Sequence, residues 1–543
     1  MNRAFAVMLA VVLGCRPTVV APAPAPVRPK VVVLLVIDQL PTWAFERDRS
    51  LFRGGLARLV RDGAYATGEL AHANTFTAPG HASIATGAPP SVHGIVGNQW
   101  YRRAEGRERP AEYDAAAPTF SVTQPGALIE DFASARALRV DGLADVLRRE
   151  SPRAHSVAVA LKARAATLVA GRAPELAIWF EAEAGGMTTS KAYGDAPPPW
   201  LFELARAKPA ARFVGQSWTP LDPALLARHT QIPDDRPGEG DVHGLGITFP
   251  HPIVDLDAIV QTPFGDEVVV DGAIAALAAM HLGEDDVPDL LALSLNAHDY
   301  AGHTWGPDSW ETLDLTLRLD AALGGLFDAL DRKVGKGGWA IVMTSDHGAT
   351  PLIERTRVAG ARRIPPAEIA AAIDEVINAE LPRGAWVAKV TSSQVYMTDA
   401  FLAATPAVRD RLLMAAAAAV AKLPGITSVH VTAPMVGTCD RRRGLDRAVC
   451  LALVPGEAGE LFVVASRGSV ITDYKTGSHH DAPNDDNRKV PILVMGPGIA
   501  PQTTTGSQLQ VAPTVAALLG ISPPPAATEA PLFVPPARSS ARP

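Results

Sequence analysis

The 543-residue chain contains only three cysteines, and aromatic residues make up only 6% of it. It has no long run of basic residues, and its formal net charge is −7. Because nucleic-acid binding depends on clustered Lys and Arg side chains, we expect no nucleic acid among its partners. After residue 14, no apolar run reaches the length of a transmembrane helix. With 47% hydrophobic residues, the chain can bury the core of a large globular enzyme.

The first residues have the features of an export signal. Arg3 is followed by an apolar run over residues 4–13 that is too short to cross a bilayer. The sequence VLGC at 12–15 resembles the lipobox of bacterial lipoproteins, which implies a lipid on Cys15; a signal peptide without lipidation is the alternative. We expect residues 1–14 to be a lipoprotein signal peptide and the Pro/Ala-rich residues 15–29 a tether. The mature protein is then periplasmic and touches a membrane only through this anchor; Arg16 after the cysteine favours the outer membrane.

The other two cysteines, Cys439 and Cys450, flank a short charged segment. In an exported protein such a pair predicts a disulfide, although two free thiols are the alternative. The Pro-rich composition of residues 523–543 predicts an unfolded tail. The chemistry therefore belongs to one catalytic domain over residues 30–522.

Three almost continuous apolar runs end at acidic or imidazole side chains. They begin at Val31, Leu290 and Trp339 and lead to Asp38, to Asp299 and His303, and to Asp346 and His347. Such runs are typical of parallel strands covered by helices on both faces, and ligands gather at the carboxyl ends of such strands. The helical spacing of Leu319, Leu323, Leu326, Phe327 and Leu330 adds a buried helix. We therefore predict an α/β fold with a doubly wound, mostly parallel sheet.

A single carboxylate at a strand end is explained by helix capping. Several carboxylates and imidazoles in one crevice require a cation to balance their charge, so we predict a metal centre. Oxygen and imidazole ligands are compatible with zinc, manganese or iron.

A different segment, NTFTAPGHASIATG at 74–87, places Thr77 just before a helix predicted to begin near Ala78. Pro79 suits the first turn, and the positive end of a helix favours an anion.

Together these motifs resemble the alkaline phosphatase superfamily, and within it the threonine-dependent, phosphate-irrepressible bacterial phosphomonoesterases, over residues 30–521. The resemblance implies an alkaline-phosphatase-like fold and two zinc ions, with Thr77 as the nucleophile bridged to the first. The implied ligands of the first ion are Asp38, Asp346 and His347, and those of the second are Asp299, His303 and a late histidine. Counting back from Val490 places that histidine at His480, with His479 as the alternative. His72, His81, His93 and His298 are expected to be structural or to hydrogen-bond within the site.

The resemblance also implies substrate contacts. Asn98 in HGIVGNQWY matches an asparagine whose amide binds a phosphoryl oxygen, and a turn is its alternative role. Lys162 and Arg164 lie in an alternating, strand-like run that would place both cations on one face. In this family such a pair is a feature of monoesterases, which hold a dianion. Thr77 and His81 stand where sulfatases carry their modified cysteine and an arginine, which disfavours a sulfatase.

The sequence thus predicts an exported, zinc-dependent hydrolase that cleaves small phosphate monoesters through a phosphothreonine on Thr77. The alternatives are a phosphodiesterase or nucleotide pyrophosphatase of the same superfamily and a catalytically silent lipoprotein that binds a phosphorylated ligand. Alternating helical and strand-like segments further predict an inserted smaller α/β cap lobe at about residues 361–469.

Overall fold

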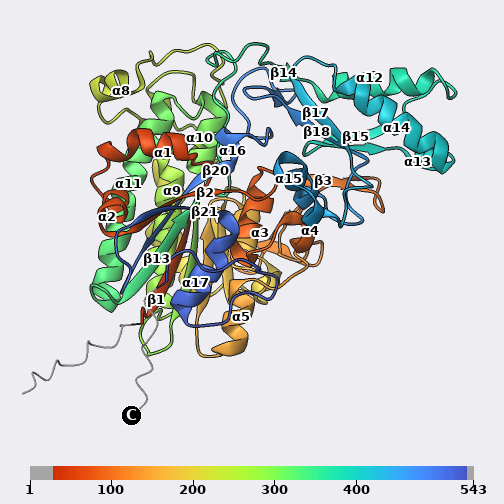
Figure 1. The fold of residues 1–543 in the computed structure, drawn as a ribbon. Helices are drawn as coiled ribbons and strands as arrows, with labels where there is room; N and C mark the ends of the chain where they lie inside the picture. Colours follow the sequence, from red (N-terminus) through yellow and green to blue (C-terminus); the bar gives the residue numbers. More distant parts are fainter. Residues whose placement is uncertain (1–27, 535–543) are drawn as a thin grey trace, which may run out of the picture.

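The computed structural model describes residues 28–534. The export signal, Cys15 and most of the expected tether lie outside these residues. A nine-stranded sheet forms the centre of the body (Figure 1). In spatial order its strands are β21 (Thr503–Ser507), β2 (Ala64–Glu69), β20 (Lys489–Met495), β13 (Trp339–Thr344), β1 (Val31–Ile37), β12 (Asp289–Leu295), β7 (Ser156–Ala160), β8 (Leu176–Glu181) and β9 (Gly186–Thr188).

The sheet is mostly parallel. Only β20 and β9 run antiparallel to their neighbours within it. The carboxyl ends of β1, β12, β13 and β7 therefore lie along one edge of the sheet. The predicted α/β fold class is confirmed.

The central strands consist of apolar residues because both faces of the sheet are covered. Every residue of β1 is buried; its odd-numbered residues pack into one core and its even-numbered residues into another. The first core contains the predicted helical stripe from Leu319 to Leu330. Its helices are α1 (Thr42–Asp48), α2 (Gly55–Asp62), α7 (Pro199–Ala207), α9 (Pro263–Ala279), α10 (Ala297–Trp305) and α11 (Trp310–Val334). The helices on the second face are α3 (Thr77–Thr86), α5 (Leu143–Glu150), α6 (Ala163–Leu168) and α17 (Val511–Leu519).

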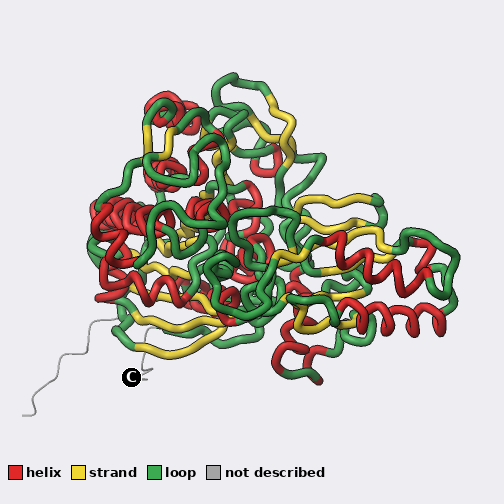
Figure 2. Tube along the Cα trace, turned by 90° about the horizontal axis from the view of Figure 1, so that it is seen from above, coloured by secondary structure: helices red, strands yellow, loops and turns green. Residues whose placement is uncertain are grey.

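A second, four-stranded sheet follows in the chain between β13 and β20. Its order is β15 (Val387–Thr391), β16 (Gln394–Met397), β18 (Leu461–Ala465) and β17 (Ile426–Val431). Helices α12 (Pro366–Asn378) and α14 (Pro406–Val420) share a separate apolar core with it. Figure 2 shows that this lobe projects sideways from the body.

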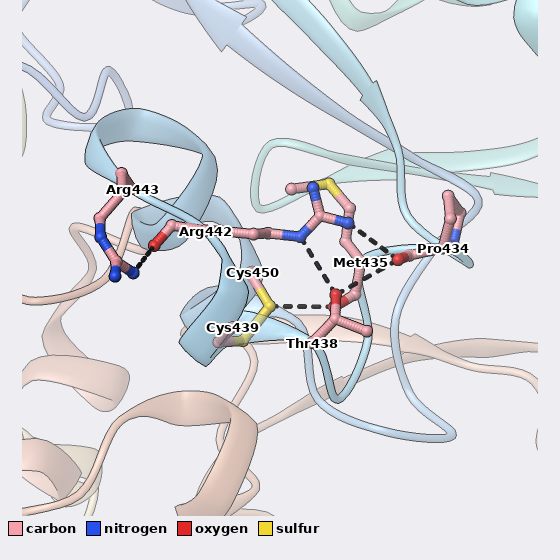
Figure 3. The surroundings of a disulfide bond; sticks show 7 residues. All are labelled: Pro434, Met435, Thr438, Cys439, Arg442, Arg443 and Cys450. Carbon is pink, nitrogen blue, oxygen red and sulfur yellow. Dashed lines mark hydrogen bonds between the residues drawn. A yellow bond between two sulfur atoms is a disulfide. The ribbon is translucent and has the colours of Figure 1, made fainter.

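The other face of the lobe sheet packs against α15 (Gly444–Ala452). Cys450 of this helix forms a disulfide with Cys439, so the predicted bond is present (Figure 3). Arg442, between the two cysteines, donates to Thr438 Oγ1 at 3.1 Å and to the carbonyl of Pro434 at 2.8 Å. The disulfide and these contacts hold the charged segment against the lobe.

The remaining elements are short. They are α4 (Pro90–His93), α8 (Pro223–Thr230), α13 (Asp399–Leu402), α16 (Asp485–Arg488), β3 (Gln99–Arg102), β4 (Arg107–Pro110), β5 (Pro118–Phe120), β6 (Leu128–Phe132), β10 (Ser217–Trp218), β11 (His251–Pro252), β14 (Arg363–Ile364) and β19 (Val470–Ile471). Among residues 28–534, no helix combines the length and apolar character needed to cross a membrane.

Two local predictions were wrong. The strand expected to carry Lys162 and Arg164 ends at Ala160; Lys162 precedes α6 and Arg164 lies in its first turn.

The second concerns the expected unfolded tail, because its residues 523–534 pack on the body instead. Phe533 is 3% exposed in the second core, and the backbone N–H of Leu532 donates to Thr514 Oγ1 at 2.9 Å.

Candidate active site

The structure brings the strand-end side chains together at one edge of the central sheet. Asp38 directly follows β1, Asp346 and His347 follow β13, and α10 after β12 carries Asp299 and His303. His480 reaches the same place from the loop before α16.

These side chains form two groups of three. Asp38, Asp346 and His347 make the first group, and Asp299, His303 and His480 make the second. Within each group, one potential ligand atom per residue lies within 4.8 Å of the others. His479 is in neither group: its Nε2 lies 3.2 Å from Thr472 Oγ1.

The three histidines are oriented by backbone carbonyls. Nδ1 of His303 lies 2.6 Å from the carbonyl oxygen of Ser478, and Nδ1 of His347 lies 2.9 Å from that of Gly348. Nδ1 of His480 contacts the carbonyl of Thr75 in the same way. With Nδ1 donating, Nε2 is an acceptor, which is the arrangement found in metal-binding histidines.

The first group holds buried polar atoms that have no hydrogen-bond partner within residues 28–534. They are Asp38 Oδ1, His347 Nε2 and Asp346 Oδ2; the last lies near His81 Nδ1 but does not form a hydrogen bond with it. Because a buried polar atom without a partner is costly, this set of two carboxylate oxygens and one imidazole nitrogen fits a divalent cation.

The pKa values reflect the crowding of charge. Burial, together with the carboxylates of Asp299 and Asp346, raises the pKa of Asp38 well above its usual range. Burial opposes ionisation of Asp299 as well, but His303 and Lys162 outweigh it and lower its pKa. Burial also lowers the pKa of His347 and that of His480, which favours the neutral imidazole that binds a metal.

Lys162 connects the two groups. Its Nζ lies 2.9 Å from Asp38 Oδ2 and also contacts Asp299. Burial disfavours the ammonium, but these two carboxylates outweigh burial and raise the pKa of Lys162. Arg164 is one-third exposed, and its Nε lies 3.4 Å from Glu112 Oε1. Although they do not share a strand, both cations line one cavity of about 330 Å³.

Thr77 is the first residue of α3 and is 1% exposed. This helix end packs directly on the loop after β13, since a Cβ on Gly80 would lie 2.5 Å from the carbonyl oxygen of Asp346. His81 joins the two segments: its Nδ1 lies 2.9 Å from the carbonyl of Thr77 and 3.2 Å from Asp346 Oδ2. Asn98 lies beside the helix end, where its Oδ1 accepts from the N–H of Ala78 at 2.8 Å.

Gln39 was not among the residues predicted from the sequence. This buried residue has a φ of 62°, which is uncommon for a residue other than glycine. Its Nε2 donates to Asp299 Oδ1 at 2.7 Å and its backbone N–H donates to Asp346 Oδ1 at 3.1 Å, so it contacts both groups. Gly302 of α10 leaves room for it, because a Cβ there would lie 1.9 Å from Gln39 Oε1. The only signal in the sequence is its position after Asp38.

The model of the type I phosphodiesterase/nucleotide pyrophosphatase family matches residues 32–487. The chain belongs to this family. It is 29% identical to alkaline phosphatase PafA of Elizabethkingia meningoseptica, over 93% of this chain and 94% of that protein. It is also 29% identical to alkaline phosphatase PhoV of Synechococcus elongatus, over 92% and 91% respectively. A crystal structure of wild-type PafA matches with a TM-score of 0.86 at 28% identity, covering 94% of this chain and 99% of that one. The chain is therefore a hydrolase of the alkaline-phosphatase-like fold.

Proposed function

We propose that the protein hydrolyses phosphate monoesters and releases inorganic phosphate. The observation that carries this proposal is that two acidic and histidine groups meet with Lys162 between them, while the end of α3 that carries Thr77 packs on the loop of Asp346. The alkaline phosphatase relatives support it, because they match this chain over nearly its whole length.

Two metal ions complete the proposed site. Asp38, Asp346 and His347 would hold one, and the second group would hold the other. We propose zinc for both, because the donors are carboxylate oxygens and neutral imidazoles. Bound cations of this kind lower the pKa of a nearby hydroxyl and stabilise charge on an ester oxygen.

Thr77 is the proposed nucleophile. Its Oγ1 gives up its proton to water and forms a bond to phosphorus while the bond from phosphorus to the ester oxygen breaks, and the departing alcohol takes a proton from water. The oxygen of another water then bonds to phosphorus and the bond to Thr77 breaks. The proton that this water loses restores the Thr77 hydroxyl, and inorganic phosphate leaves. His81 holds the backbone of Thr77 through its carbonyl and lies beside Asp346, which fixes this end of α3.

Asn98, Lys162 and Arg164 are proposed to bind the transferred phosphoryl group. Lys162 supplies a point charge, Arg164 a planar pair of donors, and Asn98 its amide N–H groups, because its Oδ1 is engaged by Ala78. Two cations favour a dianionic monoester over a diester, which carries one charge less. This preference for monoesters distinguishes the proposed enzyme from a phosphodiesterase.

The cellular location remains a proposal from the sequence. We propose that the protein is exported and anchored at the outer membrane by a lipid on Cys15, with residues 15–29 as the tether.

The proposal is tested with the full-length protein on 4-nitrophenyl phosphate and bis(4-nitrophenyl) phosphate. We expect chelation to abolish hydrolysis, zinc to restore it, and kcat/KM to be higher for the monoester. Activity that is indifferent to chelation and zinc would reject the two-metal mechanism. A higher kcat/KM for the diester would favour the phosphodiesterase, and binding of phosphate without any hydrolysis would favour the silent lipoprotein.

A further inference from the structure

A cavity of about 370 Å³ opens beside His303 and is not used by the mechanism above. One wall is Tyr300, His303 and Thr304 of α10, and another is the loop from Tyr474 to His479. Its volume falls in the range of small-molecule sites. Since His303 belongs to the second group of proposed ligands, the cavity lies on that side of the site.

The loop presents an aromatic surface to this cavity. The rings of Tyr474 and His479 are stacked, with centroids 5.6 Å apart and an interplanar angle of 11°. His479 in turn packs edge-on against His303 at 5.0 Å. Thr472 fixes the pair, because its Oγ1 accepts from the backbone N–H of Tyr474 at 3.1 Å and lies 3.2 Å from Nε2 of His479. The aromatic surface is thus held beside the second group.

Tyr474 is itself 69% exposed, more than any other large hydrophobic or aromatic residue within residues 28–534. Burial in the protein core therefore does not explain why an aromatic side chain is present at this position. An exposed ring already stacked on one neighbour is suited to stack on a planar ligand as well.

The cavity also neighbours the phosphoryl side of the site. Tyr300 and Gln261 line both it and the 330 Å³ cavity that holds Lys162 and Arg164. Gln261 is 6% exposed, and its Oε1 has no hydrogen-bond partner among the described residues. Along this shared wall, the ester substituent of a phosphoryl group held by Lys162 and Arg164 would pass these two residues on its way to Tyr474.

We infer that this cavity is the leaving-group subsite, with Tyr474 as a specificity-determining residue that selects monoesters of alcohols carrying a planar aromatic group. The inference rests on the proposed phosphomonoesterase function. The aromatic ring of the alcohol stacks on one face of the Tyr474 ring, and His479 packs against the other face.

The test compares two esters of similar intrinsic reactivity, benzyl phosphate and cyclohexylmethyl phosphate, which differ in the flatness of the ring. We expect Tyr474→Ala to lower the ratio of the two kcat/KM values, benzyl over cyclohexylmethyl, by about 3- to 10-fold. Tyr474→Phe keeps the ring and should keep the ratio. Met414→Ala, which removes a 63% exposed side chain from α14, serves as the matched surface control.

An unchanged ratio in Tyr474→Ala, or an equal fall in Tyr474→Phe, would overturn the inference. Calorimetry with benzylphosphonate and cyclohexylmethylphosphonate, which cannot be hydrolysed, gives a second readout. Tyr474→Ala should weaken binding of benzylphosphonate by the factor expected for the kcat/KM ratio. Binding of cyclohexylmethylphosphonate should not change. If the wild-type protein hydrolyses neither ester, the proposed function fails, and the calorimetric comparison still decides the inference about Tyr474.

Discussion

The side-chain amide of Gln39 donates a hydrogen bond to Oδ1 of Asp299 at 2.7 Å. This bond crosses from the loop after β1 to α10 and so links the two groups of proposed ligands. A residue that orients a ligand in this way is a positioning residue, and its loss acts through the geometry of that ligand.

We therefore expect Gln39→Asn to weaken the second group. Asn tolerates the positive φ at this position, but its shorter side chain does not reach Asp299. The expected loss is about 10- to 100-fold in metal affinity or activity. Zinc titration of the chelated protein, followed by activity, measures it, and excess zinc should recover part of the turnover. Wild-type metal affinity in Gln39→Asn would show that Gln39 has no positioning role.

His480 and its neighbour His479 form a natural pair of test and control. His480→Ala removes one member of the second group, so we expect bound zinc to fall by about half by elemental analysis, with loss of hydrolysis. His479→Ala removes a ring that contacts Thr472 and Tyr474, and full metal content should remain. The reverse result would move the ligand to His479.

Thr77 is the one hydroxyl that the mechanism requires. Thr77→Ala should lower kcat by about 10³-fold or more, as for other nucleophiles of covalent mechanisms. Thr77→Ser keeps a hydroxyl and should retain measurable turnover. Acid quenching during turnover, followed by mass spectrometry, should find phosphate on Thr77 in the wild type. A Thr77→Ala variant with near-normal turnover would mean that water attacks phosphorus directly.

Loss of Lys162 or Arg164 should lower kcat/KM more for monoesters than for diesters. We expect Lys162→Ala to lower kcat/KM for 4-nitrophenyl phosphate by about 100-fold, because a charged contact to the phosphoryl oxygens is lost. The loss for the bis ester should be clearly smaller, and Arg164→Ala should follow the same pattern. Lys162 also contacts Asp38 and Asp299, so metal content is measured in parallel. Equal losses on both esters at full metal content would remove the basis for preferring monoesters.

The positions of the proposed ligands other than His480 could be predicted because strand ends are visible in the sequence. A strand buried on both faces has to be continuously apolar, so the first polar residue after Ile37 or Thr344 marks the edge of the sheet. The shared sheet edge then brings together residues that are hundreds of positions apart, such as Asp38 and Asp346.

The turn around Lys162 could not be predicted in the same way. The small and apolar residues on either side of it suit a strand or a helix equally, and the turn is decided by Asn296. Its Oδ1 accepts from the backbone N–H of Leu161 at 3.0 Å and of Lys162 at 3.2 Å. These two hydrogen bonds turn the chain away from the strand. A contact over 130 positions leaves no local pattern. Phe533 illustrates the same limit, because one buried ring holds a segment whose average composition indicates disorder.

Stability should depend on pH through Asp266, a buried residue of α9 whose Oδ1 accepts from the N–H of Ala297 at the start of α10. Burial raises the pKa of Asp266 to about 7, whereas the unfolded chain has about 4. Between these two values the folded state holds a proton that the unfolded state has lost. The contribution of Asp266 to the free energy of unfolding is therefore complete below about pH 4 and falls by about 1.4 kcal/mol per pH unit up to about pH 7.

Asp266→Asn keeps an acceptor for Ala297 but cannot ionise. Urea unfolding of the variant and of the wild type, each at pH 5 and at pH 8, gives four free energies of unfolding. At each pH, the difference between variant and wild type removes the contribution of all other titrating groups. We expect that difference to shift in favour of the variant by about 2 to 3 kcal/mol between the two pH values, because most of the window lies between them. A difference that is the same at both pH values would mean that Asp266 is ionised throughout in the folded state. The α10 helix, which carries Asp299 and His303, would then begin beside a buried negative charge.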